Sequence, residues 1–337
     1  MARFPVSLSD SRLRLLGRAA EIPGGLAFDW SLSGIELAVR GTRVEAVLSS
    51  ADTDDIRCAY VAVDIDGRRT AQFRLKNGTA AYTLAENLPA DRITRLRLYK
   101  LSEAAFSTAT LNSLAVDGEL CPRPAAHRKT LEVIGDSISA GYGILSQGAG
   151  DPFRAETEDA ACTYGALLAE QLQTELLLTA ISGIGVCRNN GGSAHDTMIE
   201  QYDRLRPAAD TRLLWDHSRV HPDVILLNLG TNDNAAEAPR EELAAAVLRL
   251  IGRLRELHPR AAMLWVYGLM NQAYTDTLRR AVEQAAAAGA PIRFLPLPPQ
   301  TAFSDTVGSD GHPSLETHRR LAAYLLPHLA PLLADTP

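Results

Sequence analysis

In the second half of the chain, short and uniformly apolar runs alternate with longer segments whose apolar residues recur at helical spacing. A strand that is apolar on both sides must be covered on both faces, which is typical of a parallel sheet between two layers of helices. The sequence therefore predicts an α/β fold, a three-layer α/β/α domain with a parallel sheet. The expected strands are 131–134, 176–181, 224–229, 263–267 and 292–295. The expected helices are 162–173, 240–257, 275–288 and 315–333.

The first half of the chain follows a period of two. Val44, Ala46 and Leu48 lie on one side of an expected strand. The apolar run 60–65 leads into Asp66-Gly67, which is the signal of a tight β-hairpin. This alternation indicates antiparallel strands with one face toward a core and the other toward water. An all-β sandwich is therefore expected to precede the α/β domain.

The length of the chain favours two domains. A chain of 337 residues exceeds the size at which single hydrophobic cores stop growing. The segment 121–124, which contains two prolines, separates the two patterns. We therefore predict a β-sandwich domain at 1–125 and an α/β domain at 126–337.

The composition argues against two classes of partner. The net charge is −6, and no cluster of Lys and Arg is long enough to follow a phosphate backbone, so nucleic acid is not an expected partner. No apolar run reaches the roughly 18 residues of a membrane span. The N-terminus lacks the apolar core of a secretion signal, which predicts a cytoplasmic protein, or a secreted one if a leader has been removed. The sequence leaves the oligomeric state open.

A serine follows the first expected strand of the α/β domain. Open α/β sheets bind ligands at the carboxyl ends of their strands, and Gly135-Asp136-Ser137 places a hydroxyl there. A serine hydroxyl becomes a nucleophile only when a base takes its proton. His312, in Asp310-Gly311-His312-Pro313 before the last expected helix, is the candidate base. The pair predicts a serine esterase.

A neutral imidazole needs an acceptor at Nδ1 that fixes its tautomer and stabilises the cation formed in the reaction. Asp310, two residues before His312, is one candidate, and a backbone carbonyl is the alternative. His217 and His221 stand four residues apart, but no His-Glu-x-x-His motif accompanies them. We expect no metal and no cofactor.

Esterases also need hydrogen-bond donors for the tetrahedral oxyanion. Asn232, after the expected strand 224–229, offers a side-chain amide, and Ser137 offers its main-chain N–H. Gly183 or Gly185, after the expected strand 176–181, offers a further N–H. A tight turn that requires positive φ is the alternative reason for these glycines.

Four residues are candidates for the substrate-binding surface. They are Tyr142, Trp215, Gly185 and Asn189. For Trp215, packing in the core is the alternative interpretation.

The motifs resemble those of the SGNH (GDSL-type) hydrolases. Gly135-Asp136-Ser137, the segment around Gly183, Gly230-Thr231-Asn232-Asp233 and His312-Pro313 are similar to blocks I, II, III and V of that superfamily. Further details resemble carbohydrate esterase family 2. These details are the segment 215–233, Thr157-Glu158 with Tyr164, and, in the first half, Gly17-Arg18, 28–30 and 98–100, which are similar to the jelly-roll domain of that family.

The resemblance implies an O-acetylesterase that acts on carbohydrates, such as xylo-, manno- or gluco-oligosaccharides or polysaccharides. It implies Ser137 as nucleophile and carrier of the acetyl group, with His312 as base. It also implies an oxyanion hole of Ser137, Asn232 and Gly183, the last favoured over Gly185 because Ile181-Ser182-Gly183 is similar to block II.

The sequence departs from the superfamily pattern at two positions. Where the superfamily has its Asp, three residues before the histidine, this chain has Ser309, and Asp310 comes one residue later. Family 2 members sometimes use a Ser-His dyad whose histidine is oriented by a backbone carbonyl. Directly before the histidine, where that family often has a bulky aromatic residue, this chain has Gly311.

Two other functions remain as alternatives. One is a lipase-like or thioesterase-type hydrolase acting on non-sugar esters, against which the β half of the chain argues. The other is a non-catalytic carbohydrate-binding protein, against which the intact set of Ser137, Asn232 and His312 argues.

Overall fold

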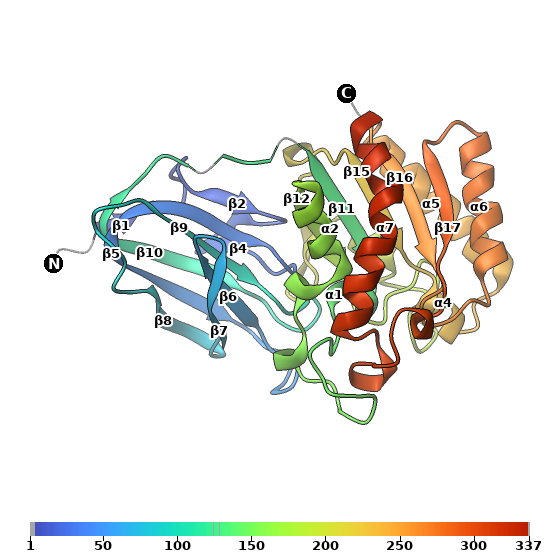
Figure 1. Ribbon diagram of the computed structural model, residues 1–337, viewed down its shortest axis with the longest axis horizontal. Coiled ribbons are helices and arrows are strands. Elements are labelled where there is room, and N and C mark those ends of the chain that lie inside the picture. Colours follow the sequence, from blue (N-terminus) through green and yellow to red (C-terminus); the bar gives the residue numbers. More distant parts are fainter. Residues whose placement is uncertain (1–3, 124, 128, 336–337) are drawn as a thin grey trace. The chain divides into compact units, whose positions relative to one another are not determined.

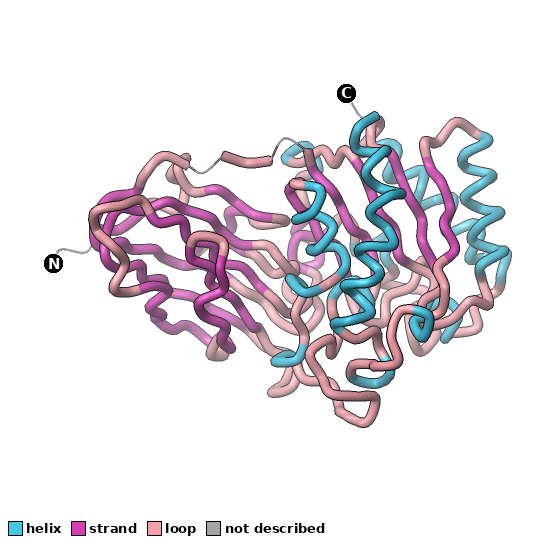
Figure 2. The backbone as a smooth tube through the Cα atoms, in the orientation of Figure 1, coloured by secondary structure: helices cyan, strands magenta, loops and turns pink. Residues whose placement is uncertain are grey.

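The computed structural model describes residues 4–123, 125–127 and 129–335. The chain divides into two compact units. Unit 1 comprises the residues up to Ala126 together with Arg154–Glu156 and Leu205–Leu213, and unit 2 comprises His127–Phe153, Thr157–Arg204 and the residues from Leu214 onward. Strands dominate unit 1, whereas unit 2 has a parallel sheet between helices, which confirms the predicted fold class (Figures 1 and 2).

Unit 1 contains a ten-stranded antiparallel sheet. The strands follow the order β3-β4-β10-β5-β9-β6-β7, with β1 beside β10 and with β2 and β8 beside β5. Their bounds are β1 Phe4–Val6, β2 Arg14–Leu16, β3 Ala20–Ile22, β4 Gly25–Ala27, β5 Gly34–Ser50, β6 Tyr60–Ile65, β7 Arg68–Arg74, β8 Gly78–Ala85, β9 Thr94–Lys100 and β10 Thr110–Leu120.

The long strand β5 changes partners along its length. Its first part, 34–39, pairs with β9, and its last part, 44–50, pairs with β8. Between these parts β5 stays paired with β10 and comes very close to it, because a Cβ on Gly41 would lie 1.9 Å from the Asp117 carbonyl oxygen. Gly118, opposite, has a φ of 133° that other residues rarely adopt. The two glycines therefore allow β5 and β10 to approach closely at the point where the other neighbour of β5 changes from β9 to β8.

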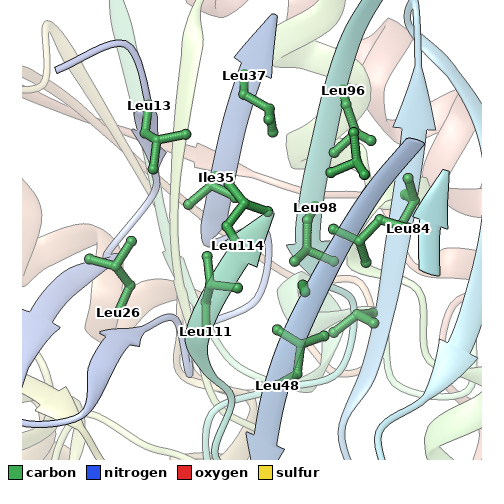
Figure 3. Packing of buried hydrophobic residues seen from close by; sticks show 14 of the residues in the cluster. Leu13, Leu26, Ile35, Leu37, Leu48, Leu84, Leu96, Leu98, Leu111 and Leu114 are labelled. Carbon is green, nitrogen blue, oxygen red and sulfur yellow. The ribbon is translucent and has the colours of Figure 1, made fainter. Parts of the chain in front are cut away.

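The core of unit 1 consists of side chains at alternate strand positions (Figure 3). Leu37, Leu48 and Leu98 are buried there, and each contributes about 2 kcal/mol by its removal from water. The predicted hairpin is present between β6 and β7. Its two turn residues, Asp66 and Gly67, have φ values of 50° and 79°, as a tight hairpin turn with two positive φ angles requires.

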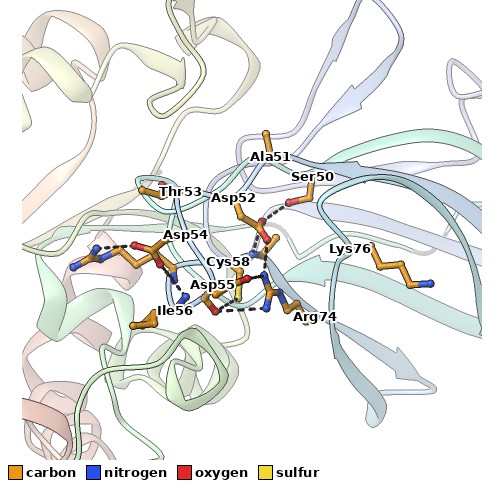
Figure 4. Close-up of polar contacts among 12 residues, drawn as sticks. Ser50, Ala51, Asp52, Thr53, Asp54, Asp55, Ile56, Cys58, Arg74 and Lys76 are labelled. Atoms are coloured by element: carbon orange, nitrogen blue, oxygen red, sulfur yellow. Dashed lines mark hydrogen bonds and ion pairs between the residues drawn. The ribbon is translucent and has the colours of Figure 1, made fainter.

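Two short segments from later in the chain belong to unit 1, which a single cut between the two sequence patterns does not predict. Arg206 donates to the buried Asp29 carboxylate over 2.8 Å. Ala155 N–H donates over 2.9 Å to the carbonyl of Ile56. Ile56 lies in the loop after β5, where the Asp54 carboxylate accepts backbone N–H groups and Arg74 bonds Asp55 (Figure 4). These polar contacts fix both segments.

Unit 2 is built on a parallel sheet in the order β12-β11-β15-β16-β17. All five strands predicted from the apolar runs are present. Their bounds are β11 Thr130–Gly135, β12 Glu175–Ala180, β15 Val224–Asn228, β16 Ala262–Tyr267 and β17 Ile292–Pro296.

Four longer helices pack on this sheet. Helices α2 (Tyr164–Leu172) and α7 (Leu315–Asp335) lie together on one face, and α5 (Arg240–Leu257) and α6 (Thr275–Ala287) lie together on the other (Figure 1). The helical predictions are confirmed to within two residues at each end. The shorter elements are α1 Ser137–Ala140, α3 Met198–Gln201, α4 Thr231–Ala235, β13 Arg204–Arg206, β14 Asp210–Leu214, η1 Ala155–Thr157, η2 Ala160–Cys162, η3 His217–Arg219, η4 Gln300–Ala302 and η5 Ser309–Gly311.

The order in which the chain adds strands to the sheet reverses at β11. The chain moves from β11 outward to β12 and then back to β15, on the other side of β11. Ligands of doubly wound folds bind at the carboxyl ends of the strands at such a reversal. Ser137 follows β11 and Asn232 follows β15, so both stand at this point. In the part of the chain that the structure describes, no helix has the length and apolarity to cross a bilayer.

Candidate active site

The turn after β11 presents Ser137 as the first residue of α1. Asp136 caps this helix, and its Oδ1 accepts from the Ile138 N–H over 3.0 Å. The first N–H groups of a helix have no acceptor within it, so the Ser137 N–H points out of the helix end. Ser137 is 5% exposed. The cap thus holds both the hydroxyl and the N–H of Ser137 at the sheet edge.

The structure brings His312 to Ser137 across 175 positions of sequence. His312 Nε2 lies 2.9 Å from Ser137 Oγ. His312 stands between η5 and α7, and Pro313 follows it directly. The distance is that of a hydrogen bond between a nucleophile and its base. The predicted pairing of these two residues is therefore present.

The acceptor at Nδ1 of His312 is the carbonyl oxygen of Ser309, at 3.1 Å. A carbonyl can only accept, so Nδ1 carries the proton and Nε2 keeps a lone pair for the Ser137 hydroxyl. Of the two acceptors considered from the sequence, the backbone carbonyl occupies the position, and the prediction that the Asp310 carboxylate does so is wrong. Asp310 has a left-handed backbone, φ 52°, and its carboxylate instead accepts from the Tyr142 hydroxyl over 2.9 Å.

The loop that follows α1 holds the Ser309 carbonyl in place. A Cβ on Gly143 would lie 2.3 Å from the Ser309 Cβ, so the two backbones touch only because residue 143 is glycine. Ser146 Oγ bonds Ser309 Oγ at 2.5 Å, and the Gly308 N–H donates to the His312 carbonyl over 2.7 Å. Ser309 is fully buried. This role of Ser309 could not be predicted from the sequence, because small polar residues are common in loops and carry no signal of such a contact.

Burial lowers the pKa of His312 below its ordinary value. The hydrogen bond to the Ser309 carbonyl and the negative charge of Asp310 act in the opposite direction, and burial is the largest of the three effects. Neutral imidazole is the form that accepts a proton. The environment therefore keeps His312 in its basic form at neutral pH.

Three hydrogen-bond donors expected for an oxyanion hole belong to segments in contact. Asn232 Nδ2 donates to the Ile184 carbonyl over 2.8 Å and to Asp136 Oδ2 over 3.4 Å. Asn232 thereby joins the neighbour of Ser137 to the neighbour of Gly183. An amide nitrogen has two hydrogens, so the Ile184 carbonyl takes one and the longer, weaker bond to Asp136 takes the other.

Of the two candidate glycines, Gly183 is the one whose N–H makes no hydrogen bond to another described residue. It has a φ of 79°, and an added Cβ would meet nothing closer than 3.7 Å. The Gly185 N–H donates to Asn189 Oδ1 over 3.0 Å. A Cβ on Gly185 would lie 1.8 Å from the Arg188 carbonyl oxygen, so this glycine permits a close turn. The geometry favours Gly183 as the donor.

A buried carboxylate fixes the segment after these glycines. Asp233 accepts from the N–H groups of Val186, Cys187 and Arg188 over 2.8 to 3.1 Å. Because Asp233 is next to Asn232 in α4, one short helix holds both the amide donor and the glycine segment. The sequence showed Asp233 only as part of a motif, with no sign of its partners.

Burial raises the pKa of Asp136 to about 7, and the nearby Asp233 acts in the same direction. The hydrogen bond from the Ile138 N–H opposes this shift. Asp136 is thus the acidic group beside the site that titrates near neutral pH.

The candidate substrate-binding residues have different surroundings. Tyr142 lies against His312, with ring centroids 4.4 Å apart. Trp215 is 5% exposed, beneath the Arg219 guanidinium, which agrees with the packing interpretation. Asn189 bonds the Gly185 N–H and also donates to the His195 carbonyl. These hydrogen bonds give Asn189 and Gly185 a structural role within their own loop. A contact of either residue with a sugar stays a prediction.

Two matches to known families extend over most of the chain. A family model described as "GDSL-like Lipase/Acylhydrolase family" matches residues 133–320. A second, "Carbohydrate esterase 2 N-terminal", matches residues 15–124.

Curated relatives carry esterase names. The chain is 29% identical over 316 residues to "Cellulase/esterase CelE" of Acetivibrio thermocellus, which covers 90% of this chain and 37% of that protein. The chain thus spans little more than a third of this relative. It is 24% identical over 345 residues to an "Acetylxylan esterase / glucomannan deacetylase" of Cellvibrio japonicus, which covers 97% of this chain and 91% of the relative.

Solved structures share the whole architecture. A family two carbohydrate esterase from Clostridium thermocellum, in complex with cellohexaose, superposes with a TM-score of 0.89 at 26% identity over 96% of this chain and 99% of that one. The acetyl xylan esterase Est2A from Butyrivibrio proteoclasticus has a TM-score of 0.88 at 21% identity, over 99% and 98%. The second likeness supports the fold alone.

Proposed function

Because the chain belongs to the GDSL-like lipase/acylhydrolase family, we propose that it is a serine esterase that removes O-acetyl groups from carbohydrates. One observation carries the reaction type: His312 Nε2 lies 2.9 Å from Ser137 Oγ, while its Nδ1 is bonded to a carbonyl. The carbohydrate O-acetyl substrate class is supported by the match of the first half to a carbohydrate esterase domain and by the names of the relatives.

In the first half of the proposed reaction, Ser137 Oγ forms a bond to the acetyl carbonyl carbon as its proton passes to His312 Nε2. The carbonyl π electrons move to the oxygen. The Ser137 N–H, the Gly183 N–H and the Asn232 amide bind this oxyanion, and the amide gives up its longer, 3.4 Å bond to Asp136 Oδ2 to do so. Each such donor contributes roughly 10²-fold to 10³-fold in rate.

Collapse of the intermediate completes the transfer. The carbonyl forms again, the bond between the acetyl carbon and the sugar oxygen breaks, and His312 gives its proton to that oxygen. Water then attacks the acetyl-enzyme, and His312 accepts a proton from the water. A second collapse releases acetate and returns the proton to Ser137. Every proton transfer in this proposed cycle therefore passes through His312.

We assign the orienting role at His312 to the Ser309 carbonyl, which makes the catalytic pair a Ser-His dyad. A carbonyl fixes the tautomer as a carboxylate does, but it brings no negative charge to the imidazolium. The dyad therefore depends on its other neighbours for charge stabilisation.

The test is acetate release from acetylated xylo-, manno- and gluco-oligosaccharides, with the position of the lost acetyl group followed by NMR. We expect turnover by the wild type and its loss in Ser137→Ala, with the fold retained. Ser218→Ala, at an exposed serine of unit 2, is the matched control and should keep wild-type activity.

Three outcomes would contradict the proposal. Retained turnover in Ser137→Ala would remove the nucleophile assignment. Faster release of decanoyl than of acetyl groups would indicate a lipase-like or thioesterase-type enzyme. Binding of the oligosaccharides without any acetate release would indicate a carbohydrate-binding protein.

A further inference from the structure

Contacts of Tyr142 hold its ring against the base of the dyad. Its ring lies against the His312 ring, with centroids 4.4 Å apart and planes inclined by 35°. It stacks on Phe153 at 4.0 Å with planes inclined by 19°. Its hydroxyl donates to Asp310 Oδ2 over 2.9 Å. The ring is therefore fixed by an aromatic neighbour and, at its hydroxyl, by a carboxylate.

The backbone of Asp310 explains why its carboxylate is found there. Asp310 has φ 52° and ψ 28°, a left-handed conformation that Asp tolerates better than most residues. The Ser309 carbonyl meanwhile occupies Nδ1 of His312. The carboxylate thus bonds neither imidazole nitrogen, but it accepts from the hydroxyl of the Tyr142 ring that lies against His312, and its charge raises the pKa of His312.

The dyad needs such neighbours when Ser137 gives up its proton. His312 then becomes an imidazolium, and the group at its Nδ1 is a neutral carbonyl. A cation within about 6 Å of a ring centroid is attracted by the negative π face of that ring. The Tyr142 ring meets this condition for the His312 ring.

We propose that Tyr142 and Asp310 are positioning residues that stabilise the imidazolium form of His312 from its ring face, in place of a carboxylate at Nδ1. Tyr142 supplies its π face, and Asp310 supplies a negative charge and anchors the Tyr142 hydroxyl. The role of this interaction in turnover rests on the proposed function. The ring contact and the hydrogen bond on which it depends are present in the protein without substrate.

The other groups around His312 bring no competing charge. Ser137 faces Nε2, and the Ser309 carbonyl faces Nδ1. His318, on α7, also interacts with His312, but burial lowers the pKa of His318 to about 3, so it is neutral at neutral pH. Within the described parts of the chain, Asp310 is the charged group that acts on His312.

The direct test is an NMR titration of the His312 imidazole in the wild type and in variants, without substrate. Asp310→Asn keeps an acceptor for the Tyr142 hydroxyl and removes the charge, so the pKa of His312 should fall. Tyr142→Leu removes the π face and should lower it too. Tyr142→Phe keeps the ring but releases Asp310, and should give an intermediate value. Asp305→Asn, at an exposed carboxylate of the same loop, should change nothing.

Kinetics then shows whether the interaction serves the reaction. Because neutral His312 is the active form, a lower pKa moves the acid limb of kcat/KM to lower pH in Asp310→Asn and Tyr142→Leu. In Tyr142→Leu, kcat at the plateau should fall roughly 3-fold to 30-fold. The loss in Asp310→Asn should also stay far below the roughly 10⁴-fold loss seen when a carboxylate bonded to Nδ1 is neutralised.

The outcomes separate this inference from the proposed function. An unchanged pKa of His312 in both Asp310→Asn and Tyr142→Phe, two variants that keep the packing, would overturn the inference even if acetate is released. A shifted pKa in a protein that releases no acetate would leave the inference standing and overturn the function. A loss of about 10⁴-fold in Asp310→Asn would show that the carboxylate acts at Nδ1 instead.

Discussion

The two sides of the proposed active site, the base side around His312 and the oxyanion side around Gly183 and Asn232, are held by different kinds of contact. On the oxyanion side, the segment 183–188 is tied to the buried carboxylate of Asp233, which accepts three backbone N–H groups. On the base side, the segment 308–312 relies on a backbone carbonyl, a close approach to Gly143 and a hydroxyl pair. The acidic side chain on this side, Asp310, is exposed.

The difference follows from what each side must do. Oxyanion donors must stay fixed while charge develops, and charge-assisted hydrogen bonds in a buried place give the most rigid anchor. A base must change its own charge in each half-reaction. A neutral carbonyl at Nδ1 orients the His312 ring while leaving its charge to be balanced by more distant groups.

The largest effect is expected from Asp233→Asn, which tests the oxyanion side. The amide puts an NH₂ group where the carboxylate accepts N–H groups, so the segment 183–188 loses charge-assisted bonds. We expect a loss of about 2–5 kcal/mol in the free energy of unfolding and a fall in kcat of roughly 10²-fold, measured by urea unfolding and acetate release.

Glu242→Gln is the matched control for Asp233→Asn. Glu242 pairs with Arg188 of the same segment, but half of its side chain is exposed, so the effect should stay below about 1 kcal/mol. If Asp233→Asn lowers stability and leaves kcat unchanged, its carboxylate stabilises the fold without fixing the donor.

A smaller effect is expected from Gly143→Ala, which tests the base side. The new Cβ would lie 2.3 Å from the Ser309 Cβ, at a φ of 58°. The Ser309 carbonyl must then move away from His312 Nδ1, and kcat should fall by roughly tenfold to 100-fold. Thermal unfolding should show a loss of about 1–3 kcal/mol.

Gly148→Ala, in the same loop, is the control for Gly143→Ala, because an added Cβ there would meet nothing within 4 Å. Equal kinetics for the two alanine variants would show that the position of the Ser309 carbonyl does not limit turnover.

The smallest effect on turnover is expected from Asp136→Asn, which tests the carboxyl group between the two sides through the pH dependence of stability. The folded protein holds the Asp136 proton up to a pKa of about 7, whereas the unfolded chain releases it near the ordinary value of 3.8. The folded state therefore binds more protons, and the free energy of unfolding falls as pH rises between these values. Asparagine also caps helices well, so the variant should lose this pH dependence and keep its fold.

Unfolding in urea at pH 5 and pH 8 measures this prediction for Asp136→Asn. The wild type should lose a few kcal/mol more than the variant between the two pH values. Parallel losses would mean that Asp136 is ionised in the folded protein throughout.

The helices and strands could be predicted from the sequence because the spacing of apolar residues in each element indicates its type. The helix predicted at 240–257 is α5, and the strand predicted at 224–229 ends one residue early, as β15. The assignment of Arg206 to unit 1 was not accessible, because it depends on an ion pair with Asp29 from the far end of the chain. The spacing of apolar and polar residues within a segment does not indicate a contact between residues so far apart in the sequence.

The sequence by itself determined the order of strands and helices, and with it the places of Ser137, Asn232 and His312. Parallel strands all end at one edge, so residues that follow them must meet. Only the tertiary structure decided which oxygen bonds His312 Nδ1 and which glycine keeps a donor unpaired. Those choices depend on the backbone angle of Asp310 and on the distance from Gly143 to Ser309, which arise when two distant loops pack together.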